Sequence, residues 1–173
     1  MIRIRRIFDL ASPSDREALR QVEEILRARF LGIDEASVAA LAERLRDPFP
    51  GRLRPVVFVA EDHRRVIGFA SVLHAPDIAF FFLEYIATAS VPQETSRGGV
   101  GAALYERLRH EARELGCRAV FLEAPAEQPG QADSEIQQLR ARLRFYERLG
   151  VYVVTGTEYE LPVRDGGARG PHL

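Results

Sequence analysis

A cluster of glycines within residues 95–104 constrains this chain more than any other stretch of its sequence. The segment reads Thr-Ser-Arg-Gly-Gly-Val-Gly-Ala-Ala-Leu, follows an apolar run, and opens a pattern of apolar residues at helical spacing. Glycine has no Cβ, so an anion can approach its backbone closely, and the N–H groups of a first helical turn have no acceptor within the helix. The segment therefore predicts a phosphate-binding loop at a helix N-terminus, with a tight strand-to-helix turn as the alternative.

Two common nucleotide-binding motifs do not fit this glycine loop. The chain contains no lysine, whereas a P-loop ends in Lys followed by Ser or Thr. A dinucleotide fingerprint closes the first strand of its unit, whereas this loop follows the strand-like runs over residues 55–87. We therefore expect the loop to hold the diphosphate of another cofactor, mainly through the backbone N–H groups of Gly99, Val100, Gly101 and Ala102.

Composition narrows the class of protein. With 173 residues, 46% of them hydrophobic, we expect one domain over residues 1–163 and a flexible tail over 164–173. The net charge of −1 predicts neither nucleic acid nor a membrane surface as partner, and no signal or membrane-spanning pattern is seen, so we expect a cytoplasmic protein. A single cysteine, Cys117, and isolated histidines such as His74 and His110 indicate no disulfide framework and no metal site.

Hydrophobic periodicity gives the order of the elements. Alternating patterns predict strands at residues 2–7, 55–61, 66–74, 80–87, 118–123, 151–154 and 158–163, and helical spacing predicts helices at residues 13–30, 35–46, 100–115 and 136–149. The strands over residues 55–87 should form an antiparallel meander, because short polar turns separate them.

This order, together with the glycine loop, resembles the GNAT superfamily of N-acetyltransferases. Their acyl-CoA pyrophosphate loop has Gln or Arg, two residues, Gly, any residue, then Gly or Ala; residues 99–101 match its second half, whereas Ser96 takes the Gln/Arg position and Arg97 follows one place later. The resemblance implies an α/β GNAT fold, with a mixed, mostly antiparallel central sheet of about seven strands flanked by about four helices.

The resemblance also implies an activity. We expect acetyl-CoA as the co-substrate, no metal, and direct transfer of the acetyl group to a primary amine of a small molecule or peptide; a homodimer would be compatible. The cofactor would be held by Arg97, Gly98 and the loop backbone at residues 99–102, and by the strand before the loop. In that strand, Ile86, Ala87 and Thr88 would bind the pantetheine arm through their peptide groups.

Tyr146 is the predicted proton donor. It lies in the segment Arg-Phe-Tyr-Glu-Arg-Leu-Gly at residues 144–150, which looks like the late GNAT helix whose tyrosine commonly points at the cofactor sulfur. A positioned phenol can donate a proton to the thiolate that leaves when a thioester is attacked. By spacing alone, the alternative is a tyrosine that packs in the core.

Glu84 is the predicted base that accepts the proton of the acceptor amine. It is the acidic residue of an apolar strand, where alternation puts it on the face of Phe80, Phe82 and Ile86, and burial there would raise its pKa. The alternative is an edge position facing water. The next candidate base is Glu123, at the end of the following strand, with a solvated strand-end acid as the alternative. Glu158 and Glu160 share a face of the last strand and could contact a cationic substrate, or face water.

One competing function remains open. A GNAT fold could hold acyl-CoA as a regulatory signal, or bind a partner protein, without turnover. A longer acyl donor than acetyl is also compatible with the sequence.

Overall fold

The computed structural model describes residues 1–30, 32–47, 51–89, 99–124, 127 and 129–157. The chain forms two compact units, Met1–Leu122 and Glu123–Leu173. Among the described residues, the first unit holds every strand and three α-helices, and the second holds helix α4 (Asp133–Arg148). The single domain expected over residues 1–163 stays a prediction, and the tail at 164–173 lies outside the described residues.

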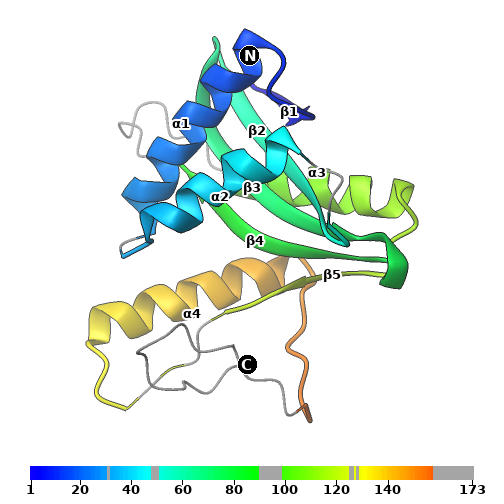
Figure 1. Ribbon diagram of the computed structural model, residues 1–173. Helices are drawn as coiled ribbons and strands as arrows, with labels where there is room; N and C mark the ends of the chain where they lie inside the picture. The colour runs from blue at the N-terminus through cyan, green and yellow to red at the C-terminus, as the bar shows by residue number, and fades with distance from the viewer. Residues whose placement is uncertain (31, 48–50, 90–98, 125–126, 128, 158–173) are drawn as a thin grey trace. The chain divides into compact units, whose positions relative to one another are not determined.

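Five strands form one sheet in the order in which they occur in the chain (Figure 1). They are β1 (Arg3–Ile7), β2 (Arg54–Asp62), β3 (Arg65–Ala75), β4 (Phe80–Thr88) and β5 (Ala119–Leu122). The first four are antiparallel neighbours, and β5 runs parallel to β4. The mixed, mostly antiparallel sheet that was expected is therefore confirmed.

Tight connections fix the register of the meander. His63 and Arg64 join β2 to β3 with φ values of 50° and 66°, and two consecutive left-handed residues match the twist of a two-residue hairpin. The short 3-10 helix η1 (Pro76–Ile78) joins β3 to β4 and is followed by the left-handed Ala79. The antiparallel meander predicted from the sequence is confirmed.

Helices α1 (Pro13–Arg29) and α2 (Glu35–Arg46) begin at side-chain caps. The hydroxyl of Ser12 accepts a hydrogen bond from the N–H of Asp15 at 3.0 Å, and the carboxylate of Asp34 accepts one from the N–H of Ser37 at 2.6 Å. Such caps supply acceptors to amides that the helix cannot satisfy. Both helices cover one face of the sheet (Figure 1), with a fully buried core that includes Val22, Leu26, Val38, Leu41, Val57, Val59 and Phe69.

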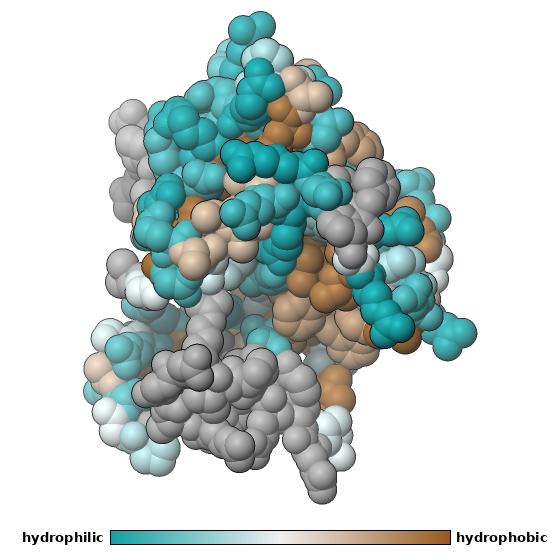
Figure 2. All heavy atoms as spheres, in the orientation of Figure 1, coloured by the Kyte–Doolittle hydropathy of each residue, from teal (hydrophilic) through white to brown (hydrophobic). Residues whose placement is uncertain are grey.

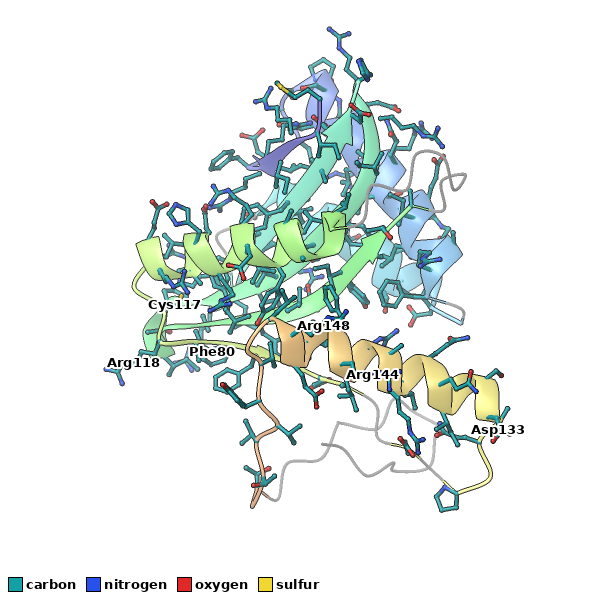
Figure 3. The ribbon with its side chains drawn as sticks, turned by 180° about the vertical axis from the view of Figure 1, so that it is seen from behind. Phe80, Cys117, Arg118, Asp133, Arg144 and Arg148 are labelled. Carbon is teal, nitrogen blue, oxygen red and sulfur yellow. The ribbon has the colours of Figure 1, made fainter. Side chains whose placement is uncertain are left out.

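Helix α3 (Val100–Glu114) covers the opposite face of the sheet, as the views from the two sides show (Figures 1 and 3). It contacts β2, β3 and β4, and its residues Leu104 and Leu108 are fully buried. On the strands, Phe58 and Phe81 are also fully buried. The centre of the sheet is therefore apolar on both faces, and the positions that can do chemistry lie toward its ends and edges.

The expected number of about seven strands is wrong, because the sheet has five strands among the described residues. Residues 151–154 form no strand, and Tyr152 is 86% exposed there. The other unmatched strand candidate, residues 158–163, lies outside the described residues. Valine and tyrosine favour strands only where a neighbouring strand gives them a surface to pack on, so their local pattern overpredicted the sheet. The four α-helices match the expected number.

A buried carboxylate connects α3 to the first strand. Glu111 of α3 is only 9% exposed and pairs with Arg6 of β1 and with Arg107, one turn earlier in α3, at 2.8 Å each. Two charge-assisted hydrogen bonds offset the cost of taking this charge out of water. The pairing fixes the C-terminal half of α3 against the β1 edge of the sheet.

His74 of β3 makes folding sensitive to pH. It is 7% exposed and packs edge-on against Phe81, with the ring centroids 5.2 Å apart. Burial lowers the pKa of its imidazole below the ordinary 6.5, and the charges of Arg54 and Arg6 lower it further. The unfolded chain thus binds a proton more readily than the folded one. The stabilisation from neutral His74 is complete above about pH 6.5 and is lost as the pH falls through the lowered folded pKa.

We expect His74→Gln to flatten the dependence of stability on pH. Wild-type protein should lose free energy of unfolding between pH 7.5 and 5.5, and the variant should lose less, since glutamine does not titrate. Urea denaturation at several pH values measures this. Equal slopes in wild-type protein and in His74→Gln would contradict the assignment.

Candidate functional site

The parallel pair β4 and β5 separates partway along β4. The two strands pair from Phe80 with Ala119 to Leu83 with Leu122, where β5 ends, whereas β4 continues to Thr88. At the start of the pair, the N–H of Arg118 donates to the carbonyl of Ala79 at 2.7 Å (Figure 3). Beyond Leu83, the described residues provide no strand on this side of β4.

The predicted pantetheine-binding residues lie on this part of β4. Ile86, Ala87 and Thr88 pair with β3 on one side, and no strand among the described residues pairs with them on the other. Because backbone groups of a strand point alternately to its two sides, part of their hydrogen-bonding capacity is directed away from β3. An extended chain with amide groups could add to this edge as a further strand does.

Helix α3 begins at the glycine loop without a side-chain cap. Its N-cap is Gly99, in the left-handed region with φ 108° and ψ −8°, which a residue with a side chain rarely adopts. The carbonyl of Gly99 accepts the first helical hydrogen bond, from the N–H of Ala103 at 2.8 Å. The amides of residues 99–102 therefore precede the helical ladder, as an anion site requires. Arg97 and Gly98 lie outside the described residues.

Gly68 of β3 brings the helix start against the free part of β4. It pairs with Thr88, and a Cβ built on it would lie 3.1 Å from the carbonyl oxygen of Ala87, 3.1 Å from Val100 Cγ1 and 3.2 Å from Leu104 Cδ1. Only a residue without a side chain allows α3 and β4 to lie this close. The sequence signal was a glycine inside a strand, which often marks a close approach, and it was missed.

A β-bulge in β4 determines the position of Glu84. Ser71 of β3 pairs with Tyr85, and the next residue, Val72, pairs with Leu83. Glu84 is therefore an extra residue of β4, with no residue opposite it in the register of β3. One extra residue reverses the alternation of side chains beyond it. Tyr85 and Ala87 consequently pack against the core under α1 and α2, and the ring of Tyr85 meets Phe30 edge-on at 5.2 Å.

The expectation that Glu84 shares a face with Ile86 is wrong for this reason. Glu84 lies on the face of α1 and α2, as Phe80 and Phe82 do, but the bulge turns Ile86 to the other face. The sequence of β4 alone cannot reveal the bulge, because it does not show which residue lacks a partner on the neighbouring strand.

Glu84 is held by two neighbours. Arg44 of α2 donates to both carboxylate oxygens, at 2.8 and 3.2 Å, and the hydroxyl of the buried Ser71 donates to one of them at 3.2 Å. The carboxyl group is 16% exposed. A forked guanidinium contact stabilises the ionised carboxylate and fixes its orientation. About one of its four acceptor positions remains for a water or an amine.

Neither partner of Glu84 was identified from the sequence. Arg44 is one of several arginines on an amphipathic helix, and nothing in its spacing distinguishes it. Ser71 is a hydroxyl within an apolar strand, a weak signal that a polar group lies opposite.

Tyr146 lies in the second unit, near the end of α4. It is 8% exposed, and its ring contacts Phe145 edge-on at 5.2 Å. Its carbonyl accepts hydrogen bonds from the N–H groups of Leu149 and Val151, at 2.9 and 3.1 Å, where the helix ends before Gly150. The helix stop is as expected, and the role of Tyr146 stays a prediction.

The other candidates are weaker. Glu123 follows β5 and is half-buried, whereas Glu158 and Glu160 lie outside the described residues. Burial raises the pKa of the Cys117 thiol, so the thiol form is favoured and the residue is a poor nucleophile.

Among the residues that the structure describes, no three His, Cys, Asp or Glu side chains gather as metal ligands. None of the described helices is long and apolar enough to cross a bilayer.

Comparison with known proteins agrees with this geometry. Residues 54–152, more than half of the chain, match the family model described as "Acetyltransferase (GNAT) domain". This match spans β2 to the end of α4 and so includes the β4 edge and the glycine loop. No curated protein matches the chain.

Solved structures share the fold at low identity. An aminoglycoside 6'-N-acetyltransferase complexed with coenzyme A is 17% identical, with a TM-score of 0.65 over 98% of this chain and 93% of that one. A ribosomal-protein-alanine N-acetyltransferase from Brucella melitensis is 14% identical, with a TM-score of 0.62 over 96% and 100%. A protein described as a GNAT-family acetyltransferase from Desulfovibrio desulfuricans is 23% identical, with a TM-score of 0.62 over 87% and 84%.

We expect Gly68→Ala to destabilise the protein by about 1–3 kcal/mol, the usual cost of an overpacked core. The new methyl group would push α3 away from β4 at the position where both are most confined. Chemical denaturation measures the change. Gly51→Ala is the control: its Cβ would meet nothing closer than 3.5 Å, so its effect should stay within about 0.5 kcal/mol. Equal effects of the two changes would contradict the close approach.

Proposed function

This chain belongs to the acetyltransferase (GNAT) family, and we propose that it transfers an acetyl group from acetyl-CoA directly to a primary amine. The observation that carries the proposal is that the start of α3 and the edge of β4 lie together in the unit Met1–Leu122. The start of α3, where Gly99 provides no side-chain cap, lies against β4, which has no neighbour beyond Leu83 on the β5 side in the described part of the chain. Together they offer an anion site and a hydrogen-bonding edge, the two things that an acyl-CoA needs along its length.

The amides of Gly99, Val100, Gly101 and Ala102 would hold the diphosphate of coenzyme A, with Arg97 and Gly98 completing the loop. The uncapped helix N-terminus favours negative charge, because unsatisfied N–H groups and the helix dipole both act there. Peptide groups of Ile86, Ala87 and Thr88 would bind the pantetheine arm. Bound acetyl-CoA supplies an activated acyl group as a thioester.

Transfer forms a C–N bond to the amine, breaks the C–S bond of the thioester, and moves one proton off the nitrogen. An ammonium has no lone pair, so the acceptor must lose a proton before or during attack. The carboxylate of Glu84, oriented by Arg44, would accept that proton directly or through a water. Tyr146 would donate a proton or hydrogen bond to the leaving thiolate.

The acceptor would be an amine of a small molecule or a peptide. The structural neighbours include an enzyme named for aminoglycosides and one named for a ribosomal-protein alanine, which represent these two classes. We place the reaction in the cytoplasm and assign it no metal.

Replacing Ala102 tests the anion site. We expect Ala102→Glu to bind coenzyme A about tenfold more weakly than Ala102→Gln, because a carboxylate a few ångströms from a phosphate costs about 1–2 kcal/mol near a protein surface. A glutamate in the first helical turn should at the same time leave stability equal or slightly higher. Isothermal titration measures the affinity, and denaturation measures the stability.

The two variants differ only in charge, so each is the control for the other. Equal affinity for coenzyme A in both would show that no phosphate lies at this helix start.

Tyr146→Phe tests the chemistry. We expect kcat, followed as thiol release with a panel of primary amines, to fall by about 10–100-fold, with coenzyme A affinity changed less than about threefold, since a proton donor acts only as the thiolate forms. Tyr152→Phe, at an exposed tyrosine of the same unit, should leave both unchanged. Unchanged turnover in Tyr146→Phe would remove this residue from the reaction. Tight binding of coenzyme A with no amine acetylated would favour the non-catalytic binding module.

A further inference from the structure

Three phenylalanines lie together on the face of the sheet that carries Glu84. Phe80 and Phe82 of β4 alternate with Phe81 and Leu83, which are buried on the other face. Phe121 of β5 pairs with Phe82 in the parallel register, and its ring meets that of Phe80 at 5.4 Å and 88°. We call Phe80, Phe82 and Phe121 the aromatic floor.

The aromatic floor is incompletely covered. Phe121 is 45% exposed, and Phe80 and Phe82 are only partly buried. Figure 2 shows hydrophobic surface on this face, alongside the hydrophilic surface of α2. Two further apolar residues are exposed near this end of the sheet in the chain order: Leu53, just before β2, and Ile78 of η1, at 46% and 65%. Apolar surface gathered in one patch commonly marks a binding site, whereas single exposed apolar residues do not.

A charged group stands at one end of the floor. Glu84 is two residues beyond Phe82 on the same face, which corresponds to about 6–7 Å along a strand. Arg44 and Ser71 occupy three acceptor positions of its carboxylate, and the fourth can accept from a ligand. The site therefore combines one hydrogen-bond acceptor for an amine with an apolar surface a short distance away.

We propose that the aromatic floor binds the apolar body of the acceptor, and that the acceptor is a primary amine attached through two or three carbons to an aromatic or aliphatic group. This proposal rests on the proposed transfer to an amine. The amine would lie at Glu84, next to the open edge of β4, and the apolar group would cover Phe82 and Phe121. A strongly hydroxylated polyamine would instead leave these rings in contact with polar groups and water, without the gain from burying them.

Binding can be measured apart from turnover. The protein saturated with coenzyme A is titrated with 2-phenylethylamine and with ethanolamine, an equally small amine without an apolar body. We expect 2-phenylethylamine to bind at least tenfold more tightly, and Phe121→Ser to reduce that advantage at least fivefold. Phe8→Ser is the matched control, because Phe8 is 66% exposed and follows β1 at the opposite edge of the sheet. Equal affinity for the two amines, or equal losses in the two variants, would overturn the proposal.

Turnover separates this proposal from the activity on which it rests. If 2-phenylethylamine binds as expected but is never acetylated, binding at the aromatic floor is supported and the proposed transferase function is wrong. If ethanolamine or an aminoglycoside is acetylated at least as efficiently as 2-phenylethylamine, in kcat/KM, the transferase function stands and the floor proposal fails.

Sedimentation excludes a different occupant. If a second copy of this chain covered the aromatic floor, Phe121→Ser would dissociate a wild-type dimer and Phe8→Ser would not. That result would overturn the proposal in favour of a protein interface.

Discussion

The extra residue in β4 is the constraint on which the candidate site depends. Pairing with β5 ends at Leu83, the residue immediately before the bulge at Glu84. Because a bulge bends its strand and increases the local twist, it provides a physical reason for the two parallel strands to separate at this point. The same residue brings the carboxylate of Glu84 and the ring of Tyr85 to one face, where α2 supplies Arg44. One inserted residue thus accounts for both the opening of the sheet and the charge beside it.

A second constraint acts from the other face. Helix α3 can begin beside Ala87 only because Gly68 has no side chain. Its N-cap, Gly99, likewise has no side chain that could accept a hydrogen bond from the first helical turn. An uncapped helix start in contact with protein would ordinarily cost stability. The arrangement is understandable if an anion completes it. An anion bound there would then also stabilise the start of α3.

Much of the fold could be predicted because its signals are local. Helix α2 was predicted with its observed bounds, since its apolar residues recur at helical spacing and a prolyl segment follows them, and the meander followed from alternation and a polar turn. A strand was wrongly predicted at residues 151–154, since its apolar pattern is local whereas a strand forms only beside a second strand. The contacts within the candidate site were harder to predict because they too depend on segments far apart in the sequence. Glu84 and the loop amides were predicted from local sequence patterns, and their roles stay predictions. The contacts of Arg44, Ser71 and Gly68 depend on which segments meet, and the bulge leaves no trace in the sequence.

In the complex that we propose, coenzyme A lies along β4 beyond Leu83, with its diphosphate at the start of α3. Amide chemical shifts in a ¹⁵N-labelled sample, recorded with and without coenzyme A, test this most directly. The account predicts that the largest changes fall on residues 86–88 and 99–102, with little change in β1 at the far edge of the sheet. Saturation of the protein with coenzyme A while these amides remain unmoved would contradict it.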